Sequence, residues 1–248
     1  MTEKVVAITG GTRGIGEAVR TLFRERGYCV AVCSRSPREQ SLPSDVFHMQ
    51  VDVRTRSQQE IFVKAIVEKF GRLDAFVNNA GVSRWSAIGD VDETFATTLL
   101  ETNVMGTLWG CAAAAQALGQ GASIVNVSSL AGKRGSARNS VYCAAKFAVN
   151  GITQSLAKEL GPKGIRVNAV CPVYVETATI AEALGEPASP ASGMSVDSYL
   201  KEFARTQTAL GRLPSASEVA EVVYFLVSPA ASAITGQCIN VDCGALPQ

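Results

Sequence analysis

Residues 9–16 read Thr-Gly-Gly-Thr-Arg-Gly-Ile-Gly, and they connect the apolar run Val5–Ile8 to a helical pattern over Gly14–Arg26. Glycines in such a stretch let the backbone turn tightly and approach a pyrophosphate at the helix N-terminus. A glycine-rich turn alone is weak evidence, because ordinary turns also use glycine. Its position directly after a strand and before a helix is the one that a nucleotide site requires. The stretch therefore predicts a β–α unit that binds a nucleotide.

Short β-branched runs and helical patterns alternate along the whole chain of 248 residues. Strands are expected at Val5–Thr9, Cys29–Cys33, Val46–Val51, Ala75–Asn78, Ser123–Val127, Arg166–Val170 and Gln237–Val241. Helices are expected at Gly14–Arg26, Ser57–Phe70, Thr94–Leu118, Val141–Leu160 and Ser217–Val227. This alternation is typical of a parallel sheet with helices on both faces. No linker or repeat divides the sequence, which predicts a single α/β domain over residues 1–248 with a seven-stranded, doubly wound parallel sheet.

The composition argues against several classes of partner. Lys and Arg number 23 against 22 Asp and Glu, and the net charge of +1 without a basic cluster does not favour nucleic acid. The uncharged stretch from Thr102 to Gly132 contains Asn, Gln and Ser residues and five glycines, which argues against a membrane span. Seven cysteines without a CxxC pair are typical of reduced thiols. We therefore expect a cytoplasmic protein that binds no membrane and no metal.

Tyr142 and Lys146 give the second chemical signal. The i, i+4 spacing places both side chains on one face of the helix expected at Val141–Leu160. A phenol with a pKa of about 10 is a poor base at neutral pH, and a neighbouring cation favours its anion. Lowering that pKa by about three units needs about 4 kcal/mol of differential stabilisation. Taken alone, the pair is equally explained by a Tyr and a Lys that share a surface.

Further motifs occur in a fixed order around these two signals. They are Asp52-Val53, Asn78-Asn79-Ala80-Gly81, Asn103, Ser129, Arg166-Val167-Asn168, and Ile234-Thr235-Gly236-Gln237 ahead of Val241-Asp242. In this combination the sequence resembles the short-chain dehydrogenase/reductase family over nearly its whole length. The resemblance implies a Rossmann-type fold and hydride transfer with a nicotinamide cofactor.

The resemblance implies a role for each of four catalytic residues. Ser129, thirteen residues before Tyr142, would hydrogen-bond the oxygen of the carbonyl or alcohol. Tyr142 would be the general acid in reduction and the base in oxidation. Lys146 would lower the pKa of Tyr142 and hold the hydroxyls of the nicotinamide ribose. Asn103 would position a water that relays protons to Lys146.

The resemblance also implies the cofactor contacts. Those around the phosphates, adenine, ribose and nicotinamide, in chain order, are Thr9, Gly10, Arg13, Gly14, Ile15, Gly16, Ser34, Arg35, Asp52, Val53, Asn79, Ala80, Gly81, Tyr142, Lys146, Pro172, Val173, Val175 and Thr177. The preference for NADP(H) over NAD(H) is predicted from charge. An NAD site needs an Asp or Glu at the end of the second strand, where this sequence has Ser34 and Arg35. Arg35 and Ser34 can donate to a 2′-phosphate, and Arg13 would approach it from the other side.

Three features depart from the family pattern. The usual Pro-Gly after the sixth strand reads Pro172-Val173, and the usual Asp-Gly-Gly near the C-terminus reads Asp242-Cys243-Gly244. The connection Ser36–Asp45 contains two prolines, so the family's second helix is expected to be reduced to a loop. The single histidine, His48, is expected to serve packing rather than catalysis. None of these departures removes a catalytic group.

Together these features predict reversible reduction of a ketone on a small or medium-sized molecule. One alternative is a 3-oxoacyl-acyl-carrier-protein reductase, which would need a basic surface, and here only Lys133, Arg134 and Lys163 could supply it. The other alternative is a non-catalytic binding or regulatory protein with this fold.

Two further expectations concern a mobile segment and assembly. The Pro-, Gly- and Ser-rich segment Ala178–Thr208 is expected to be a mobile lid that selects the substrate. Small apolar residues of the two long helices, among them Ala113, Ala114 and Ala144, are expected to form the interface of a homotetramer or homodimer.

Overall fold

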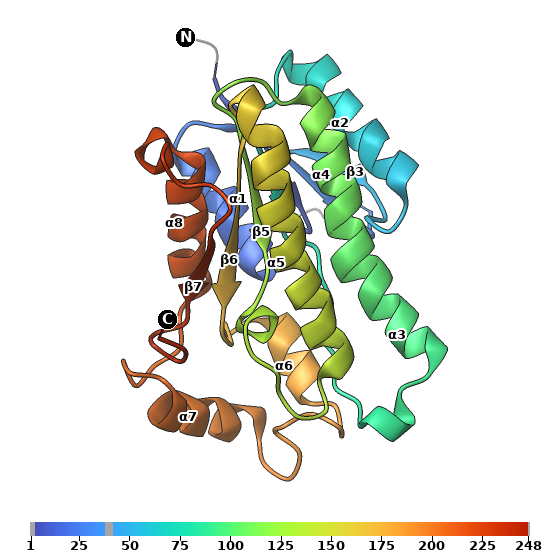
Figure 1. Ribbon diagram of the computed structural model, residues 1–248, viewed down its shortest axis with the longest axis vertical. Helices are drawn as coiled ribbons and strands as arrows, with labels where there is room; N and C mark the ends of the chain where they lie inside the picture. The colour runs from blue at the N-terminus through green and yellow to red at the C-terminus, as the bar shows by residue number, and fades with distance from the viewer. Residues whose placement is uncertain (1–2, 38–41, 248) are drawn as a thin grey trace.

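The computed structural model describes residues 3–37 and 42–247 of the protein. Its centre is a seven-stranded sheet with the strand order β3-β2-β1-β4-β5-β6-β7 and parallel pairing throughout (Figure 1). The strands are β1 (Val5–Thr9), β2 (Cys29–Ser34), β3 (Phe47–Gln50), β4 (Ala75–Asn78), β5 (Ser123–Val127), β6 (Arg166–Pro172) and β7 (Cys238–Val241). The predicted α/β class and the seven-stranded parallel sheet are confirmed, and six of the seven strands deviate from their expected ends by no more than one residue.

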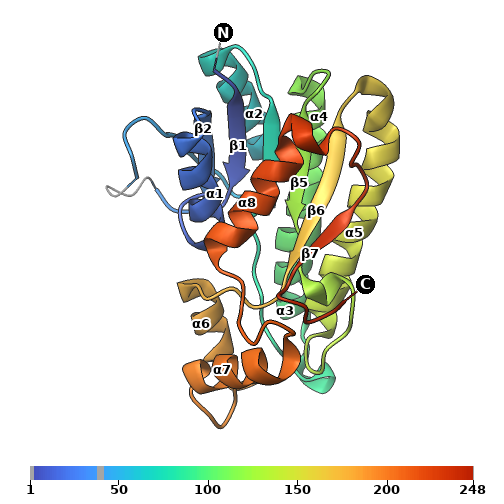
Figure 2. The same ribbon diagram turned by 90° about the vertical axis from the view of Figure 1, so that its left-hand side faces the viewer.

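Helices cover both faces of the sheet. They are α1 (Gly14–Glu25), α2 (Arg56–Phe70), α3 (Glu93–Leu100), α4 (Gly106–Ala117), α5 (Ser140–Leu160), α6 (Ala178–Leu184), α7 (Val196–Gln207) and α8 (Ala216–Val227). Helices α1 and α8 lie side by side on one face, and α2, α4 and α5 lie on the other (Figures 1 and 2). The five inner strands contribute to both apolar cores because their side chains alternate, so that Val6 and Ile8 face α1 and α8 while Val5 and Ala7 face α2 and α4.

The long helix expected at Thr94–Leu118 is interrupted. A π-helical turn, η2 (Glu101–Met105), separates α3 from α4. Because a π-turn adds a residue to one turn, it rotates the face that follows relative to a continuous α-helix. Beyond this turn, Ala113 and Ala114, expected on an outer surface, are buried because α4 packs against α2 as well as against the sheet. The prediction that these two alanines form an interface is therefore wrong.

The segment expected to be a loop-like lid contains two helices. Helices α6 and α7 lie together beyond the carboxyl ends of the strands (Figure 2). Residues with side chains on their inner faces, including Leu184, Leu200 and Ala204, form a third apolar cluster with Trp85 and Leu213. The Pro-, Gly- and Ser-rich composition did not predict these two helices. Local capping stabilises them, because the hydroxyls of Thr177 and Ser195 accept hydrogen bonds from their first turns.

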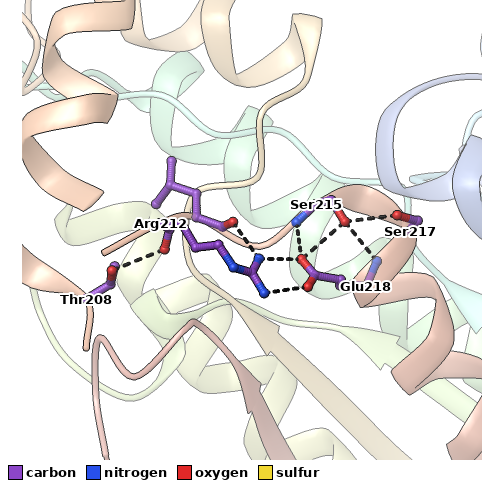
Figure 3. Close-up of polar contacts among 6 residues, drawn as sticks. Thr208, Arg212, Ser215, Ser217 and Glu218 are labelled. Atoms are coloured by element: carbon purple, nitrogen blue, oxygen red, sulfur yellow. Dashed lines mark hydrogen bonds and ion pairs between the residues drawn. The ribbon is translucent and has the colours of Figure 1, made fainter. Parts of the chain in front are cut away.

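The connection from α7 to α8 is held by polar contacts (Figure 3). Arg212 forms an ion pair with Glu218 in the first turn of α8, with Nη2 and Oε1 2.7 Å apart. Ser215 and Glu218 complete a reciprocal capping box. The hydroxyl of Thr208 at the end of α7 also donates to the carbonyl of Arg212, at 3.1 Å. This end of the α6–α7 segment is therefore fixed to the main domain.

The other departures from the family pattern have simple backbone consequences. Val173 has no positive φ, since the only described non-glycine residues with one are Arg138 and Cys243. The valine is therefore compatible with its position, whereas Cys243, with a φ of 52°, adopts the left-handed conformation that glycine adopts more easily. No helix forms in the described part of the connection from β2 to β3, and residues 38–41 of the expected loop lie outside the described residues.

Candidate active site

A cavity of about 760 Å³ opens at the carboxyl ends of the strands, beneath α6 and α7. Crevices at this edge are where open parallel sheets bind their ligands. Most of the residues predicted for the site line this one cavity, which extends from the glycine turn to Tyr142. Those lining it are Gly10, Arg13, Gly14, Ile15, Ser34, Arg35, Asp52, Val53, Asn79, Ala80, Gly81, Asn103, Ser129, Tyr142, Lys146, Pro172, Val173, Val175 and Thr177. Thr9 and Gly16 are the predicted residues that do not line it.

The glycine turn has the geometry of a phosphate cradle. Gly10 and Gly14 have φ values of 65° and 57°, which glycine adopts without strain. A Cβ at Gly16 would overlap the carbonyl oxygen of Gly10 and the side chain of Asn79, so this position cannot accept a larger residue without movement. Arg13 precedes α1 without a side-chain cap, which leaves the first amide groups of that helix for an anion. These features fit a dinucleotide pyrophosphate.

Buried polar contacts hold this turn to the loop after β4. The hydroxyl of Thr9 accepts hydrogen bonds from the amides of Asn79 and Ala80, both at 3.0 Å. The side-chain amide of Asn79 donates to the carbonyls of Thr9 and Gly10, also at 3.0 Å. Thr9 and Asn79 therefore fix the glycine turn against the loop after β4. Asn79 also lines the cavity, whereas Thr9 does not.

The end of β2 forms the part of the cavity expected to hold the adenosine. Arg35 is exposed, and the hydroxyl of Ser34 donates to the carbonyl of Ser36 at 3.0 Å. Ser34 also lies 2.9 Å from Nε2 of His48 on β3, so His48 is closer to the site than its sequence position suggested. Asp52 is held by Arg54 at 2.6 Å, and this hydrogen bond, helped by the charge of Arg35, lowers the pKa of Asp52.

Arg13 reaches across the cavity mouth. Its guanidinium lies 3.9 Å from the carboxylate of Glu182 on α6, and both side chains are more than half exposed. An exposed ion pair at this distance contributes little to stability. Arg13 therefore remains available to a cofactor phosphate.

Lys146 is the buried cation of the site. Its ammonium is 6% exposed and donates to the carbonyl of Val127, at the end of β5, at 2.9 Å. Burial lowers the pKa of Lys146 to about 8. A Cβ added to Gly81 would lie 3.7 Å from this ammonium, so glycine at 81 keeps the space beside it open.

Tyr142 stands one turn before Lys146 on α5, and the ammonium lies 5.6 Å from the centre of its ring. Burial raises the pKa of Tyr142 to about 12, while hydrogen bonds with Ser129 and Ser83 act in the opposite direction. The lowering of this pKa expected from Lys146 is therefore not seen, because desolvation outweighs the hydrogen bonds with Ser129 and Ser83. In this environment the phenol keeps its proton at neutral pH.

Asn103 lies in the π-turn η2 and is 1% exposed. Its side-chain amide donates to the carbonyls of Val82 and Leu99, at 2.9 Å each, and its oxygen accepts from the amide of Val82. A Cβ at Gly81 would lie 2.8 Å from that oxygen. Asn103 therefore holds the loop after β4 close to Lys146, and π-turns often occur at functional positions.

The part of the cavity expected to hold the nicotinamide is formed where β6 leads into α6. Pro172, Val173 and Val175 line it, and Thr177 caps α6 by accepting a hydrogen bond from the amide of Ile180. A Cβ on Gly14 would meet the Thr177 side chain at 3.5 Å. The start of α6 therefore lies against the glycine turn.

Sequence reasoning missed several lining residues. Ser83 contacts the catalytic phenol, and its position two residues after Gly81, at the carboxyl edge of the sheet, was the available signal. Tyr174 lies two residues after the end of β6 and could have been found in the same way. Tyr199 and Phe203 lie on α7, within the segment Ala178–Thr208 that was expected to select the substrate, and both line the cavity. Trp85 lines the cavity and packs in the apolar cluster with α7.

Two absences hold for the described residues. Residues 3–37 and 42–247 contain no cluster of His, Cys, Asp and Glu side chains able to hold a metal ion. Within the same ranges, no helix has the length and apolar character needed to span a membrane.

Comparison with known proteins gives full-length matches. A family model described as enoyl-(acyl carrier protein) reductase matches residues 10–245. The 3-oxoacyl-[acyl-carrier-protein] reductase of Thermotoga maritima is 34% identical over 251 residues, which cover 97% of each chain.

Solved structures agree with this result. An actinorhodin polyketide ketoreductase variant with NADPH superposes with a TM-score of 0.90 and is 32% identical, covering 98% of this chain and 97% of its own. A ligand-free aldohexose dehydrogenase of Thermoplasma acidophilum gives a TM-score of 0.89 at 29% identity, covering 99% of this chain and 98% of its own. These proteins differ in substrate while sharing the fold.

Proposed function

The chain belongs to the short-chain dehydrogenase/reductase family, and on this premise we propose that it reduces a ketone on a small or medium-sized molecule with NADPH, reversibly. One observation carries the proposal. A buried Lys146, the phenol of Tyr142 and the phosphate-type glycine turn all line one cavity at the carboxyl edge of the sheet. A binding protein without catalytic activity would have no need of the buried ammonium, whose desolvation is costly.

The chain's own groups suit the reducing direction. Bound NADPH supplies the hydride. Tyr142, kept protonated by its raised pKa, donates a proton to the developing alkoxide, and Ser129 holds the carbonyl oxygen beside it. Lys146 holds the nicotinamide ribose and supports the negative charge that develops on Tyr142 after it gives up its proton. Asn103 keeps the loop after β4 in place and would position a relay water.

Preference for NADP(H) is supported by charge at the end of β2. No carboxylate stands at Ser34 or Arg35, and Arg35 is exposed at the cavity wall. Arg13 approaches from the glycine turn, and its weak contact with Glu182 can give way to a phosphate. The resemblance to a ketoreductase whose structure contains NADPH adds support.

A 3-oxoacyl-acyl-carrier-protein reductase is the second candidate, because relatives with that name match over the whole chain. Against it, α4 has no basic residue to meet an acidic carrier. Comparing turnover of an acetoacetyl-carrier thioester with that of free ketones separates the two candidates.

The proposed enzyme is a cytoplasmic homotetramer or homodimer, and the α6–α7 segment is its substrate lid. Exposed apolar side chains on the long helices, including Leu100 at 40% and Phe147 at 48%, support association.

Nicotinamide absorbance in a ketone panel, with NADPH and NADH compared, tests the proposal. We expect turnover of at least one ketone with NADPH. If no carbonyl compound in the panel accepts a hydride, the proposed function is contradicted.

A further inference from the structure

The wall of the cavity next to Tyr142 is aromatic. Tyr174, at the end of β6, packs edge-to-face against Tyr199 and Phe203 of α7, with ring centroids 5.8 and 4.8 Å apart. Tyr199 and Phe203 are four residues apart on one helix face, and their centroids are 6.3 Å apart. All three rings are half-buried and line the cavity, so part of each ring surface faces its interior.

Packing and capping contacts hold the aromatic wall in this arrangement. Leu200 and Ala204, on the other side of α7, are buried in the apolar cluster with Trp85 and Leu213. The capping contacts around Arg212 and Glu218 fix the end of this segment (Figure 3). A preorganised set of rings loses little conformational entropy when a ligand binds.

The wall also has an unused hydrogen-bond donor. The hydroxyls of Tyr174 and Tyr199 lie 3.2 Å apart, and no other partner of either hydroxyl is seen among the described residues. Each hydroxyl has one proton, and the contact between them uses only one of the two. Burial, and then Tyr199, raises the pKa of Tyr174, so this phenol stays protonated. One proton of the pair is therefore free to be donated to a ligand oxygen.

We propose that the enzyme's substrate is a ketone that carries an aryl or polycyclic ring system. The rings stack against Tyr174, Tyr199 and Phe203, and an oxygen substituent on a ring accepts a hydrogen bond from the hydroxyl pair of Tyr174 and Tyr199. Planar rings prefer the edge-to-face and offset contacts that this wall offers, and a flexible alkyl chain gains nothing from that geometry beyond its buried area. The inference rests on the proposed ketone reduction and specifies its substrate class.

Three ketones test it with NADPH: α-tetralone, its 6-hydroxy derivative, and 2-decanone, which has the same number of carbons but no ring. We expect kcat/KM for α-tetralone to exceed that for 2-decanone by roughly tenfold or more, from contacts with two or more rings. The hydroxyl should add about threefold to tenfold. A kcat/KM for 2-decanone equal to or above that for α-tetralone would overturn the proposal.

Variants locate the effect. Phe203→Leu should reduce the ring-to-chain ratio about threefold to tenfold. Replacing both Tyr174 and Tyr199 by Phe keeps the two rings and should remove the gain from the hydroxyl, because either phenol alone could still donate its proton. Phe225→Leu, at a half-exposed phenylalanine of α8 that does not line the cavity, is the matched control and should leave the ratio unchanged. A Phe203→Leu ratio equal to that of the wild type would contradict the aromatic wall.

Binding separates failure of the substrate class from failure of the proposed function. Calorimetry with the three corresponding alcohols should give the same order of affinity. If no ketone is reduced but this order holds, the proposed function fails and the aromatic site stands. If ketones are reduced but the order is absent from both turnover and binding, only the substrate class fails.

Discussion

Replacing the buried Lys146 by Met should change how stability depends on pH. Burial lowers the pKa of Lys146 from its ordinary value of 10.5 to about 8, so the folded protein gives up this proton more readily than the unfolded chain. Between these two values the unfolded state binds more protons, and the free energy of unfolding therefore rises with pH. Methionine at position 146 keeps an apolar side chain of similar length and has no group that titrates.

The magnitude follows from the size of the shift. Each pH unit above the folded pKa adds about 1.36 kcal/mol, so at pH ~9.5 the wild type should gain about 2 kcal/mol relative to Lys146→Met, compared with pH ~7. Groups other than Lys146 titrate in both proteins and cancel in the difference. The window stops below the range where ordinary tyrosine titrates in the unfolded chain.

Urea unfolding of both proteins at the two pH values measures this difference. Lys158→Met is the matched control, because Lys158 is an exposed lysine of the same helix, and its difference from the wild type should not vary with pH. A difference between wild type and Lys146→Met that is the same at both pH values would refute the buried, desolvated ammonium.

Three further predictions concern the cofactor and assembly. Arg35→Asp should shift the kcat/KM ratio toward NAD(H) by at least about tenfold, since a charge-assisted phosphate contact contributes about 1.5–3 kcal/mol; a wild type that already favours NAD(H) would contradict the assignment. Gly16→Ala should weaken NADPH binding at least roughly tenfold because its Cβ overlaps the glycine turn, while Gly89→Ala, where a Cβ meets nothing within 4 Å, should bind normally; equal Kd values would count against the cradle. Sedimentation at micromolar concentration should show a dimer or tetramer, and a species of 26.0 kDa alone would exclude both.

Much of the fold could be predicted because its signals are local. Fully buried parallel strands such as Val5–Thr9 read as continuous apolar runs, and the glycine turn marks the first crossover. The π-turn at Glu101–Met105 left no such signal, since it arises where Asn103 bonds to the loop after β4 rather than from helix propensity. The interruption of the helix expected at Thr94–Leu118 could therefore not be predicted.

The candidate site likewise contains residues with a local sequence signal and features that depend on tertiary packing. Residues fixed by backbone geometry, such as Gly10 and Gly14, could be predicted from spacing alone. The ring contacts of Tyr199 and Phe203 with Tyr174 could not, because only tertiary packing brings α7 against the residues after β6. The direction of the pKa shift of Tyr142 also depends on burial, which the spacing of Tyr142 and Lys146 does not encode.

Turnover of Tyr142→Phe tests the central claim most directly. The phenol of Tyr142 is proposed as the proton donor, and Phe removes only the hydroxyl, so the ring packing on α5 is preserved. We predict a fall in kcat of at least about 100-fold, the lower end for a general acid, with NADPH still bound. Turnover close to that of the wild type would contradict the mechanism.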